Sequence, residues 1–185
     1  FTTRGRSVSV IFGDGAGAAV LTRSDHNGQG ILSTHLHSEG KHALELSLKG
    51  PSTQKWVPEI IEENNQDNPD YYPYMNGQFV FKNAVTRFSE VIMEGLKENG
   101  LAVSDIDMLI PHQANLRISQ FIQKKFKLSD DKVYNNIQKD GNTTAASIPI
   151  ALTEAWEEGK IKEGDKVVLA AFGSGFTWAS AVMSW

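Results

Sequence analysis

The stretch Ile106-Asp107-Met108-Leu109-Ile110-Pro111-His112-Gln113-Ala114-Asn115 is typical of a buried strand that passes directly into a helix. The mostly apolar stretch 106–110 is too short for a helix, and residues 115–126 then place apolar side chains at helical three- and four-residue steps. Ligands of α/β sheets bind outside the carboxyl ends of strands. His112 therefore stands where a functional side chain is favoured, with a surface or capping role as the alternative.

Strands and helices alternate on both sides of this junction. Prolines, Asn, Asp and Tyr concentrate between Gly50 and Tyr74, which indicates a long irregular segment beside a site. The order of the elements predicts one layered α/β domain over residues 1–185. We expect strands at 7–12, 16–21, 31–37, 43–48, 133–137, 166–172 and 176–185, and helices at 79–99 and 145–158.

The overall charge and hydrophobicity exclude several classes of protein. The 185 residues carry a formal net charge of −4 without a long block of either sign, so we expect no nucleic-acid binding. The longest apolar runs are strand-sized, far short of the roughly 20 residues that a membrane span requires. The first six residues lack the apolar stretch of a secretory signal, and we expect a cytoplasmic protein.

The chain contains no cysteine, which removes disulfides, thiolate metal sites and cysteine nucleophiles from anything that it does alone. Among the five histidines, His35 and His37 fall on one face of an expected strand. No carboxylate or further histidine has an obvious ligand spacing beside them. We therefore expect no metal site.

Two further turns carry candidate residues. Asn142 stands in the small and hydroxylic run 140–147 before an expected helix, where capping that helix is the structural alternative. The turn at 172–176 has two glycines but no lysine and no helix after it, unlike a phosphate-binding loop. The glycines of residues 13–17 precede an expected strand, so they do not fit the dinucleotide-binding pattern. Each turn is a weak indication by itself.

Taken together, four motifs resemble the β-ketoacyl-acyl-carrier-protein synthase III family. They are FGDGAGAA at 12–19, PHQAN at 111–115, GNTTAASIP at 141–149 and FGSGFTW at 172–178. Their order and the 30 residues between His112 and Asn142 resemble the family, over nearly the whole chain. The resemblance implies the thiolase-like fold, in which two similar α/β halves form an αβαβα sandwich, usually as a homodimer. This chain is similar to the C-terminal half, with a mixed five-stranded sheet and helices.

The same resemblance implies a condensing enzyme of the initiation of fatty acid synthesis. Such an enzyme joins an acyl-CoA starter to malonyl-acyl-carrier protein with decarboxylation, through a cysteine that lies in the N-terminal half. The implied partners are that half, acyl-CoA and acyl-carrier protein, and no cofactor is implied. His112 and Asn142 match the family's two catalytic donors to the malonyl thioester oxygen. Because this chain has no cysteine, we expect a fragment that is inactive alone, with a cysteine-less relative as the alternative.

The remaining site residues are also carried over from the family's motifs. The family often has glycine where Ser174 stands and asparagine where Gln78 stands, so the hydrogen bond of Gln78 is the least secure. A solvated helix face is the alternative for the basic residues. The resemblance implies an oxyanion and active-site wall at Phe172, Gly173, Ser174 and Gly175, a CoA and pantetheine channel at Gly77, Gln78, Phe81, Ala114 and Asn115, and carrier-protein docking at Lys82, Arg117, Lys124 and Lys125.

Two other functions stay open beside the condensing enzyme. A related acyltransferase of secondary metabolism would share all four motifs. A non-catalytic module that binds CoA or carrier protein would explain the missing cysteine. In every case a lone half of a two-half fold exposes an apolar face, so we expect association with another chain.

Overall fold

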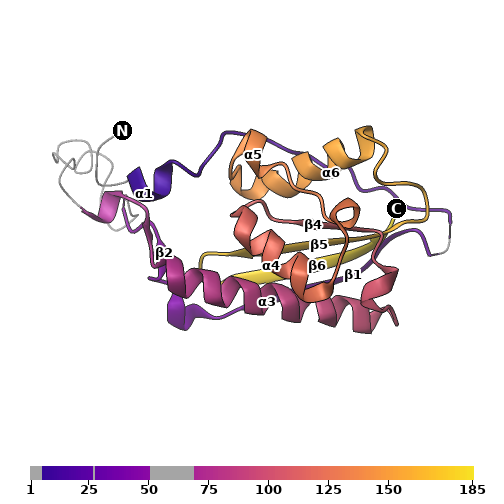
Figure 1. Cartoon of the computed structure of the whole chain (residues 1–185), viewed down its shortest axis with the longest axis horizontal. Coiled ribbons are helices and arrows are strands. Elements are labelled where there is room, and N and C mark those ends of the chain that lie inside the picture. Colours follow the sequence, from indigo (N-terminus) through magenta and orange to yellow (C-terminus); the bar gives the residue numbers. More distant parts are fainter. Residues whose placement is uncertain (1–5, 27, 51–68) are drawn as a thin grey trace.

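A computed structural model describes residues 6–26, 28–50 and 69–185, and Figure 1 shows its labelled elements. The helices are α1 (Arg6–Ser9), α3 (Gly77–Glu98), α4 (Leu116–Phe126), α5 (Ile137–Asp140) and α6 (Ser147–Glu157). The strands are β1 (Gly30–Ser38), β2 (Leu46–Ser47), β3 (Tyr74–Met75), β4 (Met108–Pro111), β5 (Lys166–Gly173) and β6 (Thr177–Ser184). Short 3₁₀ turns lie at Gly40–His42, Pro69–Tyr71, Val103–Asp105, Asp130–Lys132 and Thr144–Ala146.

The main sheet is mixed and has the strand order β1-β6-β5-β4. Strands β4 and β5 run parallel, whereas β5, β6 and β1 alternate in direction. A single bridge between Leu109 and Val133 extends the sheet beyond β4. The mixed sheet is confirmed, and the fifth strand that we expected is reduced in the described residues to this one bridging residue.

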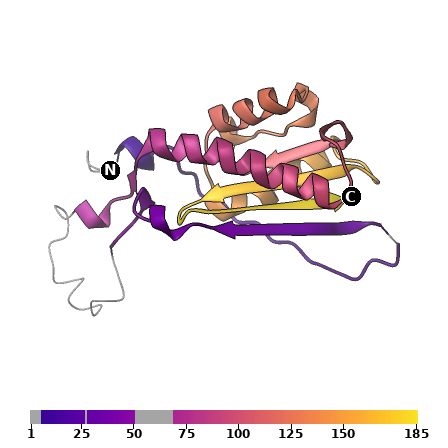
Figure 2. The ribbon, with the colours of Figure 1, turned by 90° about the horizontal axis from the view of Figure 1, so that it is seen from below.

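Helices cover both faces of the sheet, as Figures 1 and 2 show from two directions. Side chains of a strand alternate between faces, and β4 follows this rule. Leu109 packs in a core cluster with residues of α3 and α4, while Met108 and Ile110 pack with Ala151 and Ala155 of α6 on the opposite face. The chain therefore forms an α/β/α layered unit.

Helix α3 lies along the sheet for 22 residues. The Oδ1 atom of its N-cap, Asn76, accepts a hydrogen bond from the amide of Phe79, and the helix ends before Gly100, whose φ is +65°. Gly95 lets the helix approach the sheet closely, because a Cβ there would lie 2.8 Å from a methyl group of Val182. The Ser180 hydroxyl of β6 also donates to the carbonyl oxygen of Val91 at 2.8 Å. The helix is thus fixed on the sheet by packing and by a hydrogen bond.

Most of the longer elements expected from periodicity are confirmed. The strands expected at 31–37, 166–172 and 176–185 correspond to β1, β5 and β6. The helices expected at 79–99, 115–126 and 145–158 correspond to α3, α4 and α6, the last with a 3₁₀ turn at its start.

The two strands expected at 7–12 and 16–21 are wrong. The described part of this segment has the short helix α1, one bridge from Phe12 to Asn142, and no strand from residue 13 to residue 26. The N–H and C=O groups of a strand need a neighbouring strand as hydrogen-bond partner. In the described part of this segment only the backbone around Phe12 pairs in this way, with that of Asn142. The following residues run along the outer side of α5 and α6 before they reach β1 (Figure 1).

Two other expectations fail in part. The strand expected at 43–48 shortens to the two residues of β2, which pair with β3. The strand expected at 133–137 is wrong beyond Val133. The Oε1 of the buried Gln113 accepts hydrogen bonds from the amides of Asn136 and Ile137, where the chain turns into α5. Most of the irregular segment expected at 50–74 lies outside the described residues. Within the three described ranges, no helix is long and apolar enough to cross a membrane.

Candidate functional site

A cavity of about 1270 Å³ lies at the carboxyl ends of the parallel strands β4 and β5. Its wall combines the first turns of α3, the β4–α4 junction, the segment 142–148 and the end of β5. This is the position at which open α/β sheets bind ligands. Both His112 and Asn142 border it, so the structure brings the two main candidates to one cavity.

His112 is held by its backbone and by one side of its ring. Its amide donates to the carbonyl oxygen of Ala170 at 2.7 Å, and its Nδ1 atom lies 2.6 Å from the Oγ of Ser147. No described residue bonds to its Nε2 atom. Burial lowers the pKa of His112 below its usual value, because desolvation disfavours the imidazolium. The ring is therefore a neutral group at neutral pH.

Asn142 is buried and fixed at both its backbone and its side chain. Its amide donates to the carbonyl oxygen of Ile11 at 2.9 Å, and its own carbonyl accepts from the amide of Gly13 at 3.0 Å. Its Oδ1 accepts from the amide of Thr144 at 2.9 Å, with Thr144 at a φ of +54°. Among the described residues the Nδ2 group has no partner. Asn142 closes a local turn through this bond but does not cap α6, whose N-cap is Ala146 without a side-chain hydrogen bond, so the capping alternative is wrong.

The glycines near the N-terminus explain how the segment around Ile11 reaches Asn142. A Cβ on Gly13 would collide with the carbonyl oxygen of Asp140, and a Cβ on Gly17 would collide with the ring of Pro149. At Gly15 it would lie 2.9 Å from the Cδ1 of Ile150. The glycine motif therefore serves close packing against the Asn142 turn and the start of α6.

Gln113 is a positioning residue that we did not single out from the sequence. It is 3% exposed, and its Nε2 donates to the carbonyl oxygens of Pro111 and Tyr134. Its Oε1 accepts from the amides of Asn136 and Ile137 at 3.1 and 3.3 Å. The side chain thus ties the β4–α4 junction to the segment that leads to Asn142. Its only sequence signal is its place beside His112.

The turn after β5 contributes most of the wall that we expected. Phe172, Gly173 and Ser174 border the cavity, whereas Gly175 does not. Phe172 also packs in the core against Phe176, with ring centroids 4.9 Å apart. Phe172 therefore is a core aromatic residue that also borders the cavity, and its role in the site stays a prediction. The Ser174 hydroxyl donates to the carbonyl oxygen of Leu46, which fixes this turn to β2.

The residues expected to line a pantetheine channel all border the cavity. They are Gly77, Gln78, Phe81, Ala114 and Asn115. The side chain of Asn115 is already engaged, since its Oδ1 accepts from the amide of Arg117 and caps α4.

The four basic residues expected to dock a carrier protein are exposed on α3 and α4. Arg117 borders the cavity, but Lys82, Lys124 and Lys125 do not. In the part of the chain that the structure describes, none of the four forms an ion pair with a carboxylate.

His35 and His37 do lie on one face of β1, and a carboxylate that the spacing did not indicate reaches both. Glu94 of α3 approaches the Nδ1 of His35 at 3.5 Å and the Nε2 of His37 at 2.6 Å. Across the described ranges no three His, Cys, Asp or Glu side chains form a group suited to a metal ion. The histidines instead join β1 to α3.

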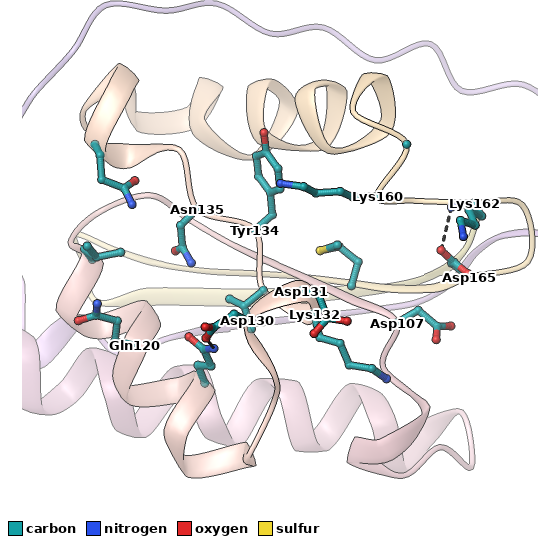
Figure 3. Close-up of a pocket in the computed structure, with 16 residues that line it drawn as sticks. Asp107, Gln120, Asp130, Asp131, Lys132, Tyr134, Asn135, Lys160, Lys162 and Asp165 are labelled. Carbon is teal, nitrogen blue, oxygen red and sulfur yellow. Dashed lines mark hydrogen bonds between the residues drawn. The ribbon is translucent and has the colours of Figure 1, made fainter.

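A second pocket, of about 630 Å³, lies near the amino ends of β4 and β5 (Figure 3). Charged side chains of both signs surround it, and several interact within the chain. Asp165 accepts from the amide of Lys162 at 2.8 Å, and the Nζ of Lys160 lies 4.8 Å from the centroid of the Tyr134 ring. No candidate residue from the sequence belongs to this pocket.

Two protein-family models match this chain. The model of the "3-Oxoacyl-[acyl-carrier-protein (ACP)] synthase III C terminal" family matches residues 96–185, and that of "3-Oxoacyl-[acyl-carrier-protein (ACP)] synthase III" matches residues 2–40. Together the two matches cover more than half of the chain.

Individual relatives extend this likeness to nearly the full chain. A β-ketoacyl-acyl-carrier-protein synthase III of Clostridioides difficile is 48% identical over 181 residues, which are 97% of this chain and 53% of that protein. The corresponding protein of Aliivibrio fischeri is 45% identical and is covered to 52%. The chain spans about half the length of the curated relatives that it matches.

Solved structures show the same fold. The crystal structure of 3-oxoacyl-acyl-carrier-protein synthase III from Aquifex aeolicus matches with a TM-score of 0.83 and 40% identity, over 97% of this chain and 52% of that one. The structure of the enzyme from Pseudomonas aeruginosa matches with a TM-score of 0.84 and 36% identity, over 97% and 52%. The fold is therefore that of a thiolase-like half.

Proposed function

This chain belongs to the 3-oxoacyl-acyl-carrier-protein synthase III family, and we propose that it supplies the C-terminal half-site of a condensing enzyme. That enzyme would join an acyl-CoA starter to malonyl-acyl-carrier protein with loss of CO₂ in the initiation of fatty acid synthesis. The observation that carries the proposal is that His112 and Asn142 border one cavity, with Nδ1 and Oδ1 bonded to the protein. The Nε2 of His112 and the Nδ2 of Asn142 have no hydrogen-bond partner among the described residues.

We assign the decarboxylation of the malonyl thioester to these two side chains. As the bond to the carboxylate breaks, its electron pair moves into an enolate, and negative charge develops on the thioester oxygen. The Nε2–H of His112 and the Nδ2–H of Asn142 are neutral donors that stabilise this charge. Removing one such donor costs roughly 10²- to 10³-fold in rate. Asparagine suits the role because it donates at any pH and does not compete as a base.

In the condensation that follows, the enolate carbon attacks the acyl-cysteine of the Cys-bearing half. The carbon–carbon bond forms, the cysteine thiolate leaves, and a 3-oxoacyl thioester results without a cofactor. We assign Phe172 to the exclusion of water from this step, since it is buried at the cavity wall. A backbone amide of the 173–175 turn would donate to the acyl-cysteine carbonyl, although Gly175 itself does not border the cavity.

The substrate arm and the carrier protein would approach from the side of α3 and α4. Gly77, Gln78, Phe81, Ala114 and Asn115 line the cavity there and suit the pantetheine arm of CoA or carrier protein. Arg117 borders the opening, and Lys82, Lys124 and Lys125 are exposed on the same two helices. Exposed cations without carboxylate partners in the described chain are suited to an acidic carrier protein.

The proposed enzyme needs a second chain segment that carries the cysteine, because the 185 residues contain none. The N-terminal segment supports this need, since the side chains of Val20 and Leu21 are 90% and 77% exposed. We propose that the Cys-bearing half packs over this segment and that two complete units form a homodimer. The cytoplasmic location stays a prediction.

The decisive experiment measures release of CO₂ from malonyl-acyl-carrier protein by this chain paired with a Cys-bearing N-terminal half. Asn142→Ala and His112→Ala should each lower the rate by about 10²- to 10³-fold. Asn83→Ala is the control, because Asn83 donates to the carbonyl of Phe79 within α3 and does not border the cavity. Carrier-protein binding without decarboxylation would instead favour the non-catalytic module. Starter selectivity then distinguishes primary from secondary metabolism.

A further inference from the structure

Ser147 is almost fully buried, 2% exposed, and its hydroxyl lies between two nitrogen atoms of the β4–α4 junction. Its Oγ is 2.6 Å from the Nδ1 of His112 and accepts from the amide of Gln113 at 3.3 Å. A backbone amide only donates, so it uses an acceptor lone pair of the hydroxyl. The hydroxyl proton therefore does not point toward Gln113, and the other neighbour of the hydroxyl is the Nδ1 of His112.

The direction of the second hydrogen bond follows from this inventory. Among the described residues the hydroxyl of Ser147 has no further partner, and leaving a buried donor without an acceptor is destabilising. The hydroxyl is satisfied only when it donates to Nδ1 of His112. In that arrangement Nδ1 carries a lone pair, and the single proton of the neutral imidazole lies on Nε2.

We infer that Ser147 is a positioning residue that holds His112 in the tautomer with the proton on Nε2. The inference rests on the proposed function for its catalytic consequence, since Nε2 is the atom left to face the cavity. In the other tautomer Nε2 would present a lone pair to the thioester oxygen, and the two would repel each other as charge develops. Gln113 contributes through its backbone amide, which occupies one of the two acceptor lone pairs of the serine and leaves Nδ1 of His112 as the acceptor for the hydroxyl proton.

The tautomer is measured directly by ¹⁵N NMR of the full chain labelled at histidine. At neutral pH the wild type should show a protonated Nε2 and an unprotonated Nδ1 at His112. A protonated Nδ1 in the wild type would overturn the inference without any substitution.

Two pairs of variants test the role of the hydroxyl. Ser147→Thr keeps the hydroxyl and Ser147→Val replaces it with a methyl group of similar shape, so only the valine variant should show a larger share of the tautomer protonated at Nδ1. Ser147→Ala should do the same, and Ser119→Ala is its control, because the Oγ of Ser119 is equally buried but has no hydrogen-bond partner among the described residues. Unchanged ring shifts in both Ser147→Val and Ser147→Ala would refute the role of Ser147.

Decarboxylation separates this inference from the proposed function. With the Cys-bearing half present, Ser147→Ala should lower the rate of CO₂ release about tenfold, the effect of one net hydrogen bond of about 1.4 kcal/mol, and Ser147→Thr should restore most of it. If the tautomer shifts as expected but the wild type releases no CO₂, the proposed function fails while the inference about Ser147 stands. If the wild type releases CO₂ and Ser147→Ala shifts the tautomer without lowering that rate, the catalytic consequence of Ser147 is refuted.

Discussion

The amide of Gly13 donates to the carbonyl oxygen of Asn142 across 3.0 Å, although the two residues are far apart in the sequence. This contact places the glycine-rich segment directly behind one of the two proposed catalytic side chains. The segment therefore belongs to the site even though it contributes no side chain to the chemistry.

Gly13→Ala should disturb both stability and the site, because the new methyl group collides with the carbonyl of Asp140. Overpacking of this kind typically costs about 1–3 kcal/mol in the free energy of unfolding. Urea denaturation checks it. Gly40→Ala is the matched control, since no atom lies within 4 Å of a Cβ at that position. Equal stabilities of the two variants would show that the segment is free to move away.

Gln113→Ala should destabilise the fold strongly. It removes a side chain that is 3% exposed and leaves two carbonyl oxygens and two amides without this partner. Each buried unsatisfied group costs about 1–3 kcal/mol, so we expect a loss of at least about 2 kcal/mol, read from chemical denaturation. Gln120→Ala, on the exposed side of α4, should change the unfolding free energy by less than about 0.5 kcal/mol. A small effect at Gln113 would mean that water replaces its bonds.

Glu154 should make stability depend on acid pH. Lys139 is the main cause that lowers the pKa of its carboxyl from the usual 4.5, and Asn136 adds a hydrogen bond of 2.8 Å. Because the folded state binds the proton more weakly than the unfolded state, this stabilisation is complete above pH 4.5 and is lost as the pH falls through the lower folded-state pKa.

The matching variant is Glu154→Gln. At pH 7 it should unfold more easily than the wild type by about 1 kcal/mol, and the difference should shrink below pH 4.5. Thermal unfolding at several pH values measures this, and Glu157→Gln on the same helix controls for the loss of one surface charge. A difference that stays constant with pH would contradict the assignment.

Arg117→Glu should weaken binding of the proposed carrier protein more than Lys125→Glu does. Arg117 borders the cavity and Lys125 lies in the last turn of α4, away from it. We expect the Kd of Arg117→Glu to be about tenfold higher than that of the wild type at low salt. This difference should become smaller as salt rises, because exposed charges are screened. Titration calorimetry at two ionic strengths measures both. Equal effects of the two substitutions would favour a diffuse solvated face over a docking site.

The sequence predicted the elements whose own periodicity is strong. Helix α3 and strands β5 and β6 follow from apolar spacing alone, and His112 follows from its place between a strand and a helix. The segment at 7–21 has a strand-like pattern too, but a strand also requires a partner, and local residues carry no information about whether one is present.

The candidate site was predicted through its motifs more than through its contacts. Asn142 was a candidate from its turn but gained its role through the resemblance, while most hydrogen bonds of the Gln113 and Ser147 side chains join residues that are more than 20 positions apart in sequence. Such bonds depend on the folded backbone, because a buried glutamine or serine looks like any polar residue of a turn. Glu94 escaped notice beside His35 and His37 for the same reason.

Helix α3 makes contacts near both of its ends, and these contacts limit insertions and deletions within the helix. Phe81 near the amino end borders the cavity, and Gly95 near the carboxyl end faces Val182 of the sheet. Since consecutive helical residues are rotated by about 100°, inserting or deleting a single residue between them would turn one of the two away from its contact. Evolutionary or engineered length changes in this family member are therefore expected to fall in loops, and any within α3 to come in steps close to whole turns.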